Sequence, residues 1–389
     1  MRKWLLSLLL LLTLSVWSNA QTSGIGGINL SLWPSIATQG VDTVSGKTLL
    51  NLGINSKMNQ LTGIGLNVLG STTVSGVNGL QLSGLFNVVG GDMRGWQAAG
   101  ITNVIRNDLT GLSVSGLVNV VGGKASGLLL TGGVNILGDG QEGIIASGLL
   151  NIIGGEAKGI QVAGIGNISS DAVYGLQLAG LFNISGEQTI GLQTSALLNI
   201  AAGQMNGVQV GLINLAASSM NGFQIGLFNY HSNRLRGLQL GLINANPSTR
   251  LQLLLSGGTS TLFNVGLRFK SRTFYTIIST GAKYRELHPF NTVFTYRAGL
   301  AIPLAKAFEI SGDLGYQHIE TFRKHEAMNR LYNLQARLNL EYLCSEKTSI
   351  FFSGGYERGY SYRHNHLLHE SFFAEVGTAL TIGNFQVTK

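Results

Sequence analysis

Three histidines near the carboxyl end of the chain are the residues whose spacing most suggests chemistry. His364, His366 and His369 form the pattern H-x-H-x-x-H, which Glu370 follows. Imidazole nitrogens bind transition metals, so three closely spaced rings could hold such an ion. The spacing matches no strict ligand pattern, however, and a solvated basic loop accounts for the same residues. The sequence therefore predicts no cofactor, and it leaves these three histidines as weak candidates for metal ligands.

The same stretch offers a candidate nucleophile. His369 and Ser371 form H-x-S, which resembles the pair in outer-membrane lipid A deacylases, in which the His activates the Ser. The rest of that family's pattern is missing, above all an acid placed beyond the Ser. The many G-x-G patterns elsewhere precede no helix that could cradle a phosphate. The sequence thus favours a protein that is not an enzyme.

A periodic Asn is the strongest regularity of the chain. From Asn87 to Asn199 an Asn recurs every 16 residues, and from Asn199 to Asn244 every 15. A fixed short period means one repeated structural unit. Identical buried amides one strand spacing apart can satisfy one another, although Asn also favours turns for other reasons. We predict an Asn ladder at the corner of a β-solenoid, formed by Asn87, Asn103, Asn119, Asn135, Asn151, Asn167, Asn183, Asn199, Asn214, Asn229 and Asn244.

Each repeat has two halves, as in GLQLSGLFNV and the shorter GLQLGLIN. The shorter copies lose a small residue before the second Gly. In one uninterrupted strand, that deletion would turn the Asn to the opposite face. We therefore predict a bend at Ser83-Gly84, with Leu80, Leu82, Leu85 and Asn87 all facing the interior.

The segments outside the repeats differ from them in composition. Arg2 and Lys3, an apolar run and Ser18-Asn19-Ala20 predict a signal peptide. Six of the seven His residues and most aromatic residues follow the last repeat, together with most of the net charge of +8. Because the charges are scattered among aromatic strands and the protein is predicted to be exported, we expect no nucleic-acid partner. We divide the chain into a signal peptide at 1–20, an N-terminal cap at 21–45, the repeats at 46–245 and a second domain at 246–389.

The second domain reads as eight antiparallel strands with alternating polarity. Alternation places Arg297 inside, together with Asn333, Gln335, Arg337 and Asn339. Tight connections alternate with longer ones, which we expect at 285–291, 318–330 and 357–371. Short turns at one end and long loops at the other are typical of a transmembrane β-barrel, and eight strands suffice to close one. A water-soluble antiparallel barrel or sandwich is the alternative.

The repeats also carry a resemblance. GLQLGLIN, GFQIGLFN and GLQLSGLFN resemble the Gly- and Asn-rich surface repeats of exported proteins from Gram-negative bacteria, including Bacteroidetes and Leptospira. The resemblance covers roughly residues 46–245, and its specificity comes from many copies in register. It implies an outer-membrane or cell-surface location and no established activity.

The predicted fold is all-β: a β-solenoid of 15- and 16-residue repeats, then an antiparallel eight-stranded β-barrel of the outer-membrane type. The function that fits best is a non-enzymatic outer-membrane or cell-surface protein, a structural or adhesive scaffold anchored by the barrel. Its expected partners are then outer-membrane lipid and other components of the cell surface or envelope. Two alternatives stay open: one large barrel pore or transporter in which every repeat is a membrane strand, and a barrel enzyme that acts on lipid.

Overall fold

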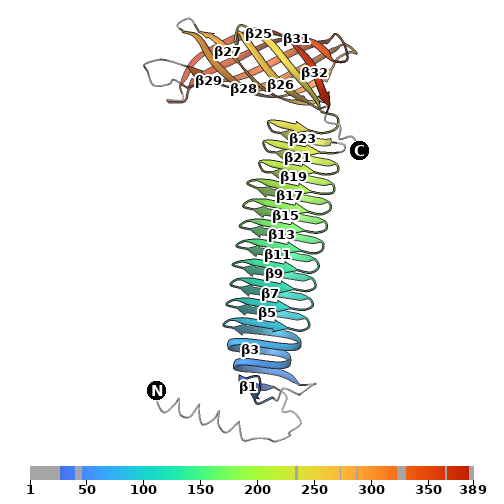
Figure 1. Ribbon diagram of the computed structural model, residues 1–389, viewed down its shortest axis with the longest axis vertical. Coiled ribbons are helices and arrows are strands. Elements are labelled where there is room, and N and C mark those ends of the chain that lie inside the picture. The colour runs from blue at the N-terminus through green and yellow to red at the C-terminus, as the bar shows by residue number, and fades with distance from the viewer. Residues whose placement is uncertain are drawn as a thin grey trace. The chain divides into compact units, whose positions relative to one another are not determined.

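The computed structural model describes residues 27–39, 46–232, 235–271, 273–285, 288–321, 330–363 and 366–384. The predicted signal peptide and His364 lie outside these residues. Strands make up the regular structure of the described chain (Figure 1). No helix among the described residues is long and apolar enough to cross a bilayer. The chain divides into two compact units, Met1–Gly203 and Gln204–Lys389.

The first unit is a β-solenoid in which every coil after the continuous β3 contributes one long and one short strand. It begins with β1 (Ile28–Trp33), β2 (Ile36–Ala37) and the continuous β3 (Lys47–Ser83). The long strands that follow are β5 (Met93–Ala99), β7 (Leu109–Ser115), β9 (Ala125–Thr131), β11 (Gln141–Ser147), β13 (Ala157–Ala163), β15 (Val173–Ala179) and β17 (Thr189–Ser195). The short strands are β4 (Phe86–Val89), β6 (Thr102–Ile105), β8 (Val118–Val121), β10 (Val134–Leu137), β12 (Leu150–Ile153), β14 (Gly166–Ser169), β16 (Phe182–Ser185) and β18 (Leu198–Ala201).

β1 and β2 pair antiparallel, and each strand from β3 on pairs in parallel with the equivalent strand of the next coil. Asn135 lies beside Asn151, and Gly143 lies beside Gly159, so the register offset equals the sequence repeat. The long strands therefore form one parallel sheet and the short strands another, as the stacked coils in Figure 1 show. Repeats paired in this way are coils, so the alternative of one large barrel with a membrane strand from every repeat is wrong.

The interior of the coils is more polar than expected. Gln81 and Asn87 are buried, whereas Leu80 and Leu82 are half-buried and Leu85 is 40% exposed. The prediction that these three leucines face inward is wrong. The predicted bend at Ser83-Gly84 is present: β3 ends at Ser83, the chain bends at Gly84 and Leu85, and β4 starts a new alternation at Phe86. Gln81 and Asn87 thus point inward, and the leucines point out.

The second unit begins with further coils and continues into a barrel. Its coils contain β19 (Met205–Val210), β20 (Ile213–Ala216), β21 (Met220–Ile225), β22 (Phe228–His231), β23 (Leu235–Leu240) and β24 (Ile243–Ala245). They pair in parallel with the 15-residue offset, so that Asn214 lies beside Asn229. Compared with the 16-residue copies, each long strand here is one residue shorter, with six residues instead of seven, while the turn to the short strand keeps two residues and the Asn stays inside.

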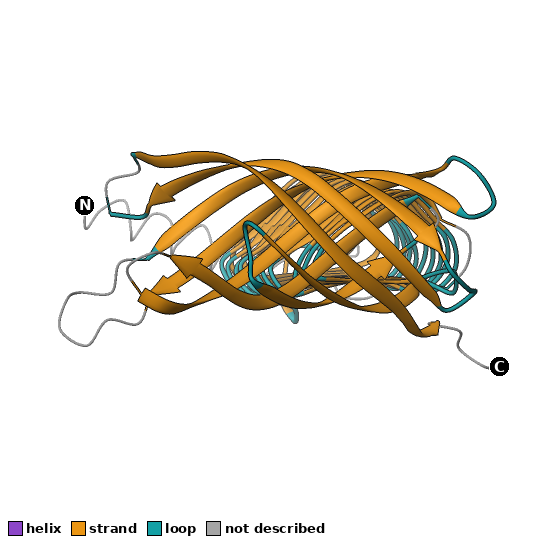
Figure 2. Ribbon diagram, turned by 90° about the horizontal axis from the view of Figure 1, so that it is seen from above, coloured by secondary structure: helices purple, strands orange, loops and turns teal. Residues whose placement is uncertain are grey.

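Eight antiparallel strands close the barrel, as predicted (Figure 2). The first strand pairs with the last, with Arg250 opposite Asn384. The strands are β25 (Arg250–Gly258), β26 (Phe263–Lys270), β27 (Phe274–Arg285), β28 (His288–Pro303), β29 (Phe308–Thr321), β30 (Leu331–Leu343), β31 (Thr348–Ser361) and β32 (Leu367–Asn384).

Some connections between the barrel strands are shorter than the sequence predicted. Residues 271–273, 304–307 and 344–347 connect strands at the end that holds Arg250 and Asn384. At the other end, the long loops predicted at 285–291, 318–330 and 357–371 are partly strand. β28 begins at His288, β29 runs to Thr321 and β31 to Ser361, because antiparallel pairing continues to satisfy backbone groups there.

Candidate functional site

The outer wall of the barrel is apolar around much of its circumference. Leu314 and Leu338 are 71% and 67% exposed, and Phe372 is 86% exposed. They alternate along their strands with buried polar residues, as the burial pattern of β30 shows. Leucine and phenylalanine side chains this exposed, on neighbouring strands, form a larger apolar surface than water-soluble monomers usually carry.

The barrel interior is filled by charged groups that pair with each other. The guanidinium of Arg268 donates two hydrogen bonds to Glu341, at 2.7 and 2.8 Å, and a third to Gln252 at 2.7 Å. Both charged side chains are almost fully buried. A buried ion pair persists only where hydrogen bonds replace its lost hydration, and this bidentate geometry supplies them.

Further pairs continue this network along the lumen. Arg337 pairs with Glu375 and lies 4.6 Å from the ring centre of Phe373. Lys283 pairs with Glu357 at 2.7 Å, and Lys270 pairs with Glu309. Arg297, Asn333, Gln335, Arg337 and Asn339 all face inward, as alternation predicted.

The centre of the barrel is packed rather than open. Among the described residues, no group hydrogen-bonds Nε or Nη2 of Arg297, or Oδ1 of Asp313. A cavity of ≈ 10 Å³ lies beside these side chains. That volume holds about one water molecule, which could satisfy the charged atoms. Arg297 and Asp313 therefore border a space of about the size of one water molecule at this level.

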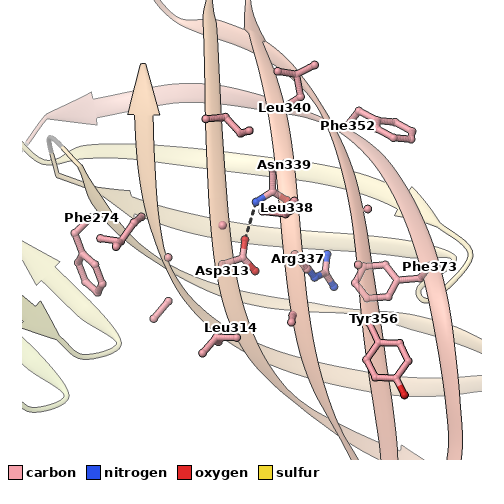
Figure 3. A pocket seen from close by; sticks show the side chains of 18 of the residues that line it. Phe274, Asp313, Leu314, Arg337, Leu338, Asn339, Leu340, Phe352, Tyr356 and Phe373 are labelled. Atoms are coloured by element: carbon pink, nitrogen blue, oxygen red, sulfur yellow. Dashed lines mark hydrogen bonds between the residues drawn. The ribbon is translucent and has the colours of Figure 1, made fainter. Parts of the chain in front are cut away.

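A larger depression of ≈ 1080 Å³ lies against the barrel wall, and its lining also includes Leu238 of β23 (Figure 3). Its outward lining includes Leu314, Leu338 and Phe352, while Asp313 accepts a hydrogen bond from Asn339 at 2.9 Å beneath them. Gly354 contributes to the hollow, since a Cβ built on it meets no atom within 4 Å. The depression presents mostly hydrocarbon, which suits contact with an acyl chain better than polar catalysis.

The predicted histidine cluster is only partly within the described structure. His369 Nε2 lies 3.6 Å from Oε1 of Glu357, and Ser371 donates to the same oxygen at 3.3 Å. Glu357 also accepts hydrogen bonds from Ser260 at 2.7 Å and Gln335 at 2.8 Å. The described side chains contain no group of three residues placed to bind a metal. The H-x-S pair thus belongs to the network of the lumen.

The Asn side chains form hydrogen-bonded rows within the coils. Asn151 Nδ2 donates to Oδ1 of Asn167 and to the carbonyl of Val162, both at 2.8 Å. Its own Oδ1 accepts from Asn135 at 2.9 Å. The same amide-to-amide bonds join Asn87, Asn103, Asn119, Asn167, Asn183 and Asn199 in the first unit, and Asn214, Asn229 and Asn244 in the second. A separate short run joins Asn29 to Asn51 at 2.8 Å and Asn51 to Asn67 at 2.9 Å. Among the described residues Nδ2 of Asn67 has no hydrogen-bond partner, and Ser71 is the residue that lies beside Asn87.

A second row, which we did not predict, is built from Gln. Gln177 donates to Gln161 at 2.8 Å, and Gln193 donates to Gln177 at 2.7 Å. In the second unit Gln239 donates to Gln224 at 2.7 Å. The fixed Gln in GLQL is the signal that could have revealed it, because a polar residue between two aliphatic ones in a strand faces the opposite side.

Comparisons with known proteins give no family. No family model and no curated protein matches the chain. The barrel is similar to the N-terminal β-barrel domain of Pseudomonas aeruginosa OprF, with 12% identity and a TM-score of 0.26 over 34% of this chain and 96% of that one. It is similar to Neisserial surface protein A (NspA), with 9% identity and a TM-score of 0.25 over 34% and 96%. A de novo designed transmembrane β-barrel has 13% identity and a TM-score of 0.23 over 35% and 97%.

Proposed function

We propose that the protein is a non-enzymatic structural protein of the bacterial outer membrane, in which the barrel is the anchor and the solenoid a scaffold. The observation that carries this proposal is the reversed polarity of the barrel. Its wall exposes Leu314 and Leu338, while Arg268 and Glu341 pair inside. Hydrocarbon outside and ion pairs inside are stable when lipid surrounds the wall, and barrel closure leaves no unpaired strand edge in that lipid.

The connections of the barrel favour a periplasmic scaffold over a surface adhesin. In outer-membrane barrels, short turns face the periplasm and longer loops face the exterior. Arg250, where the chain enters the barrel, lies at the end with the turns at 271–273, 304–307 and 344–347. The coils that precede Arg250 in the chain would then be carried on the periplasmic side.

The two remaining activities fit the described geometry less well. A pore needs an open lumen, whereas Arg297 and Asp313 border a cavity of only ≈ 10 Å³. A lipid enzyme needs a nucleophile that reaches its substrate, whereas Ser371 hydrogen-bonds Glu357 within the lumen. Structural anchoring requires neither an open channel nor an exposed nucleophile.

Substitution of Leu338 with Arg tests the anchor. Leu338 is central in β30 and 67% exposed. In a membrane barrel, Leu338→Arg should reduce the free energy of folding into phospholipid vesicles by about 2–4 kcal/mol, because Arg on the lipid face must leave water. In a water-soluble barrel, the same surface substitution should change stability by about 0.5 kcal/mol or less.

Leu304→Arg is the matched control, because Leu304 is similarly exposed but lies in the turn at 304–307. We expect it to change the free energy of folding by less than about 1 kcal/mol, as at a membrane interface. The measurement is an equilibrium titration of the full mature chain with urea in the presence of vesicles. Equal, small effects of both substitutions would contradict the membrane anchor.

A further inference from the structure

From Gly79 to Gln204, the charged residues of the solenoid lie along one edge of the coils. We call the connection from each short strand to the next long strand the charged turn; residues 154–156 are one example. Every charged residue from Gly79 to Gln204 lies in a charged turn or at the second position of the long strand that follows: Asp92, Arg94, Arg106, Asp108, Lys124, Asp139, Glu142, Glu156, Lys158, Asp171 and Glu187.

Neighbouring charges on this edge pair with each other in water. Lys124 donates to Glu142 at 2.6 Å, and Lys158 lies 2.8 Å from Glu156. The hydrogen bond from Lys124 lowers the pKa of Glu142, and that with Glu156 raises the pKa of Lys158. Both pairs are exposed, and because charged groups are costly to place in hydrocarbon, the edge they mark suits water or lipid headgroups.

The opposite turn is apolar. We call the connection from each long strand to the next short strand the leucine turn, because an aliphatic residue follows its Gly in most coils. Leu117 in this turn is 57% exposed, and Leu149 is 46% exposed. The same position holds Leu85, Ile101, Ile165, Leu181 and Leu197 in other coils of the first unit. The turn therefore forms an aliphatic row opposite the charged edge of the coils.

The outer faces of both sheets extend this apolar surface. Trp96, Ile144 and Val162 point outward from long strands, and Ile136 points outward from a short strand, all with large exposed areas. The coil cannot bury them itself, because Asn and Gln rows and a core that includes Ile145 occupy its interior. Three adjoining sides of the solenoid thus expose hydrocarbon, far more than isolated apolar residues on a soluble surface.

We propose that the solenoid itself lies in a membrane leaflet, with the leucine turns among the lipid acyl chains and the charged turns at the headgroups. A second copy of this chain could cover one flat sheet, but it could not cover both outer faces and the turn between them. A fluid hydrocarbon phase covers all three sides at once. This inference goes beyond the proposed anchor, since it rests on the coils alone.

The dimensions of one coil agree with the thickness of a leaflet. Trp96 and Ile101 are five residues apart, and at about 3.3 Å per residue the chain between them spans at most about 16 Å, because β5 ends at Ala99. Half of a hydrocarbon core of about 30 Å has the same depth. Parallel pairing on both sides of each inner strand, as β11 has with β9 and β13, also satisfies the backbone groups that lipid cannot.

Aromatic residues mark the boundary between the two environments. Tyr174 occupies the second position of β15, beside the charged turn, and its hydroxyl accepts a hydrogen bond from Gln188 at 2.7 Å. Lys158 lies 5.8 Å from the centre of the same ring. Trp96 lies two residues beyond Arg94 on the outer face of β5. Tyr and Trp are enriched at this depth of membrane proteins, where apolar rings and polar atoms are both accommodated.

Lipid quenching of site-specific labels tests the inference in the full mature chain. The only cysteine, Cys344, is replaced in Cys344→Ser, and a fluorescent thiol label is attached after Leu149→Cys or Glu156→Cys. Each protein is reconstituted in phosphatidylcholine vesicles with or without bromine atoms at mid-chain. We expect several-fold stronger quenching at position 149 than at position 156, and slow reaction of Leu149→Cys with a water-soluble maleimide.

The label at Leu338→Cys on the barrel wall separates this inference from the proposed anchor, and Leu181→Cys repeats the solenoid measurement in a second coil. Quenching at position 338 with free aqueous access at 149 and 181 would overturn the inference and leave the anchor intact. Quenching at 149 and 181 without quenching at 338 would support the inference and overturn the anchor. If the labels at positions 149 and 181 are protected from both bromine quenching and maleimide, a protein partner covers these positions instead of lipid. That result also overturns the inference.

Discussion

The side-chain amide of Asn151 uses both its donor and its acceptor within the coils. It donates to Asn167 and to the carbonyl of Val162, and it accepts from Asn135. Each Asn is thereby a partner of both neighbours, so the loss of one leaves two buried groups unpaired. This mutual dependence explains why one residue type recurs at one position, since aspartate lacks the donor and glycine lacks both groups.

Replacement of Asn151 by Leu should therefore destabilise the first unit by about 1–3 kcal/mol, the cost of buried polar groups left without partners. Asn107→Leu is the control, because Asn107 lies exposed in a charged turn and should change stability by about 0.5 kcal/mol or less. Urea unfolding followed by tryptophan fluorescence measures both, since Trp33 and Trp96 lie in this unit. Equal effects of the two substitutions would show that the Asn row adds no special stability.

The sequence is informative about residue spacing and less so about residue direction. The period of Asn led to the row through Asn151, and alternation placed Arg297 inside the barrel. The predicted inward direction of Leu85 was wrong, because the prediction assumed that aliphatic residues lie in the core. That assumption holds in water, whereas a chain whose exterior meets lipid can place Gln81 inside and Leu85 outside.

At the scale of the element, a column of glycines sets how closely the long strands stack. Gly143 has a φ of 113°, and a Cβ on it would lie 2.3 Å from the carbonyl oxygen of Gly127 in the preceding coil. Only glycine accepts both the dihedral angle and the contact. The Gly at the start of every GLQL is thus a structural requirement of the coil and not a flexible point.

Gly143→Ala should lower the stability of the first unit by at least about 1–3 kcal/mol, the usual cost of a strained backbone conformation. Gly354→Ala on the barrel wall serves as control, since its new Cβ meets no atom within 4 Å. The midpoint of thermal unfolding of each variant, again by tryptophan fluorescence and by circular dichroism, measures the difference. A Gly143→Ala protein as stable as the wild type would refute the role of the column.

The barrel strands were predictable because alternation continues along each of them, and all eight predicted strands are present. The ends of β28, β29 and β31 were not, because backbone pairing there extends into polar sequence that composition assigns to loops. The inward direction of the carboxylates in the lumen, such as Glu341 and Glu357, follows from the alternation of polar and apolar residues along their strands. Their partners come from strands far away in sequence, which no local pattern indicates.

At the scale of the whole molecule, the solenoid and the barrel share one physical plan. Each satisfies polar groups inside, through the Asn and Gln rows in one and the Arg268–Glu341 type of pair in the other. Each leaves aliphatic side chains outside. This shared polarity supports the proposed membrane location of the barrel and of the apolar sides of the coils, while the charged turns stay outside the hydrocarbon.

The central claim is that the barrel crosses the outer membrane with Arg250 and Asn384 at its periplasmic end. The native Cys344 is exposed at this end, in the turn at 344–347, and Arg363 is exposed at the other. A membrane-impermeant maleimide applied to intact Gram-negative cells that express the protein tests both ends. The comparison uses the native chain and an Arg363→Cys variant in a Cys344→Ser background.

We predict that the cysteine at position 363 reacts on intact cells, and that Cys344 reacts only after the outer membrane is permeabilised. Opposite accessibility of the two ends of one barrel is what a membrane-spanning barrel in this orientation requires. Reaction of both cysteines on intact cells, or of both only after permeabilisation, would contradict the claim, because the two ends would then lie on the same side of the membrane.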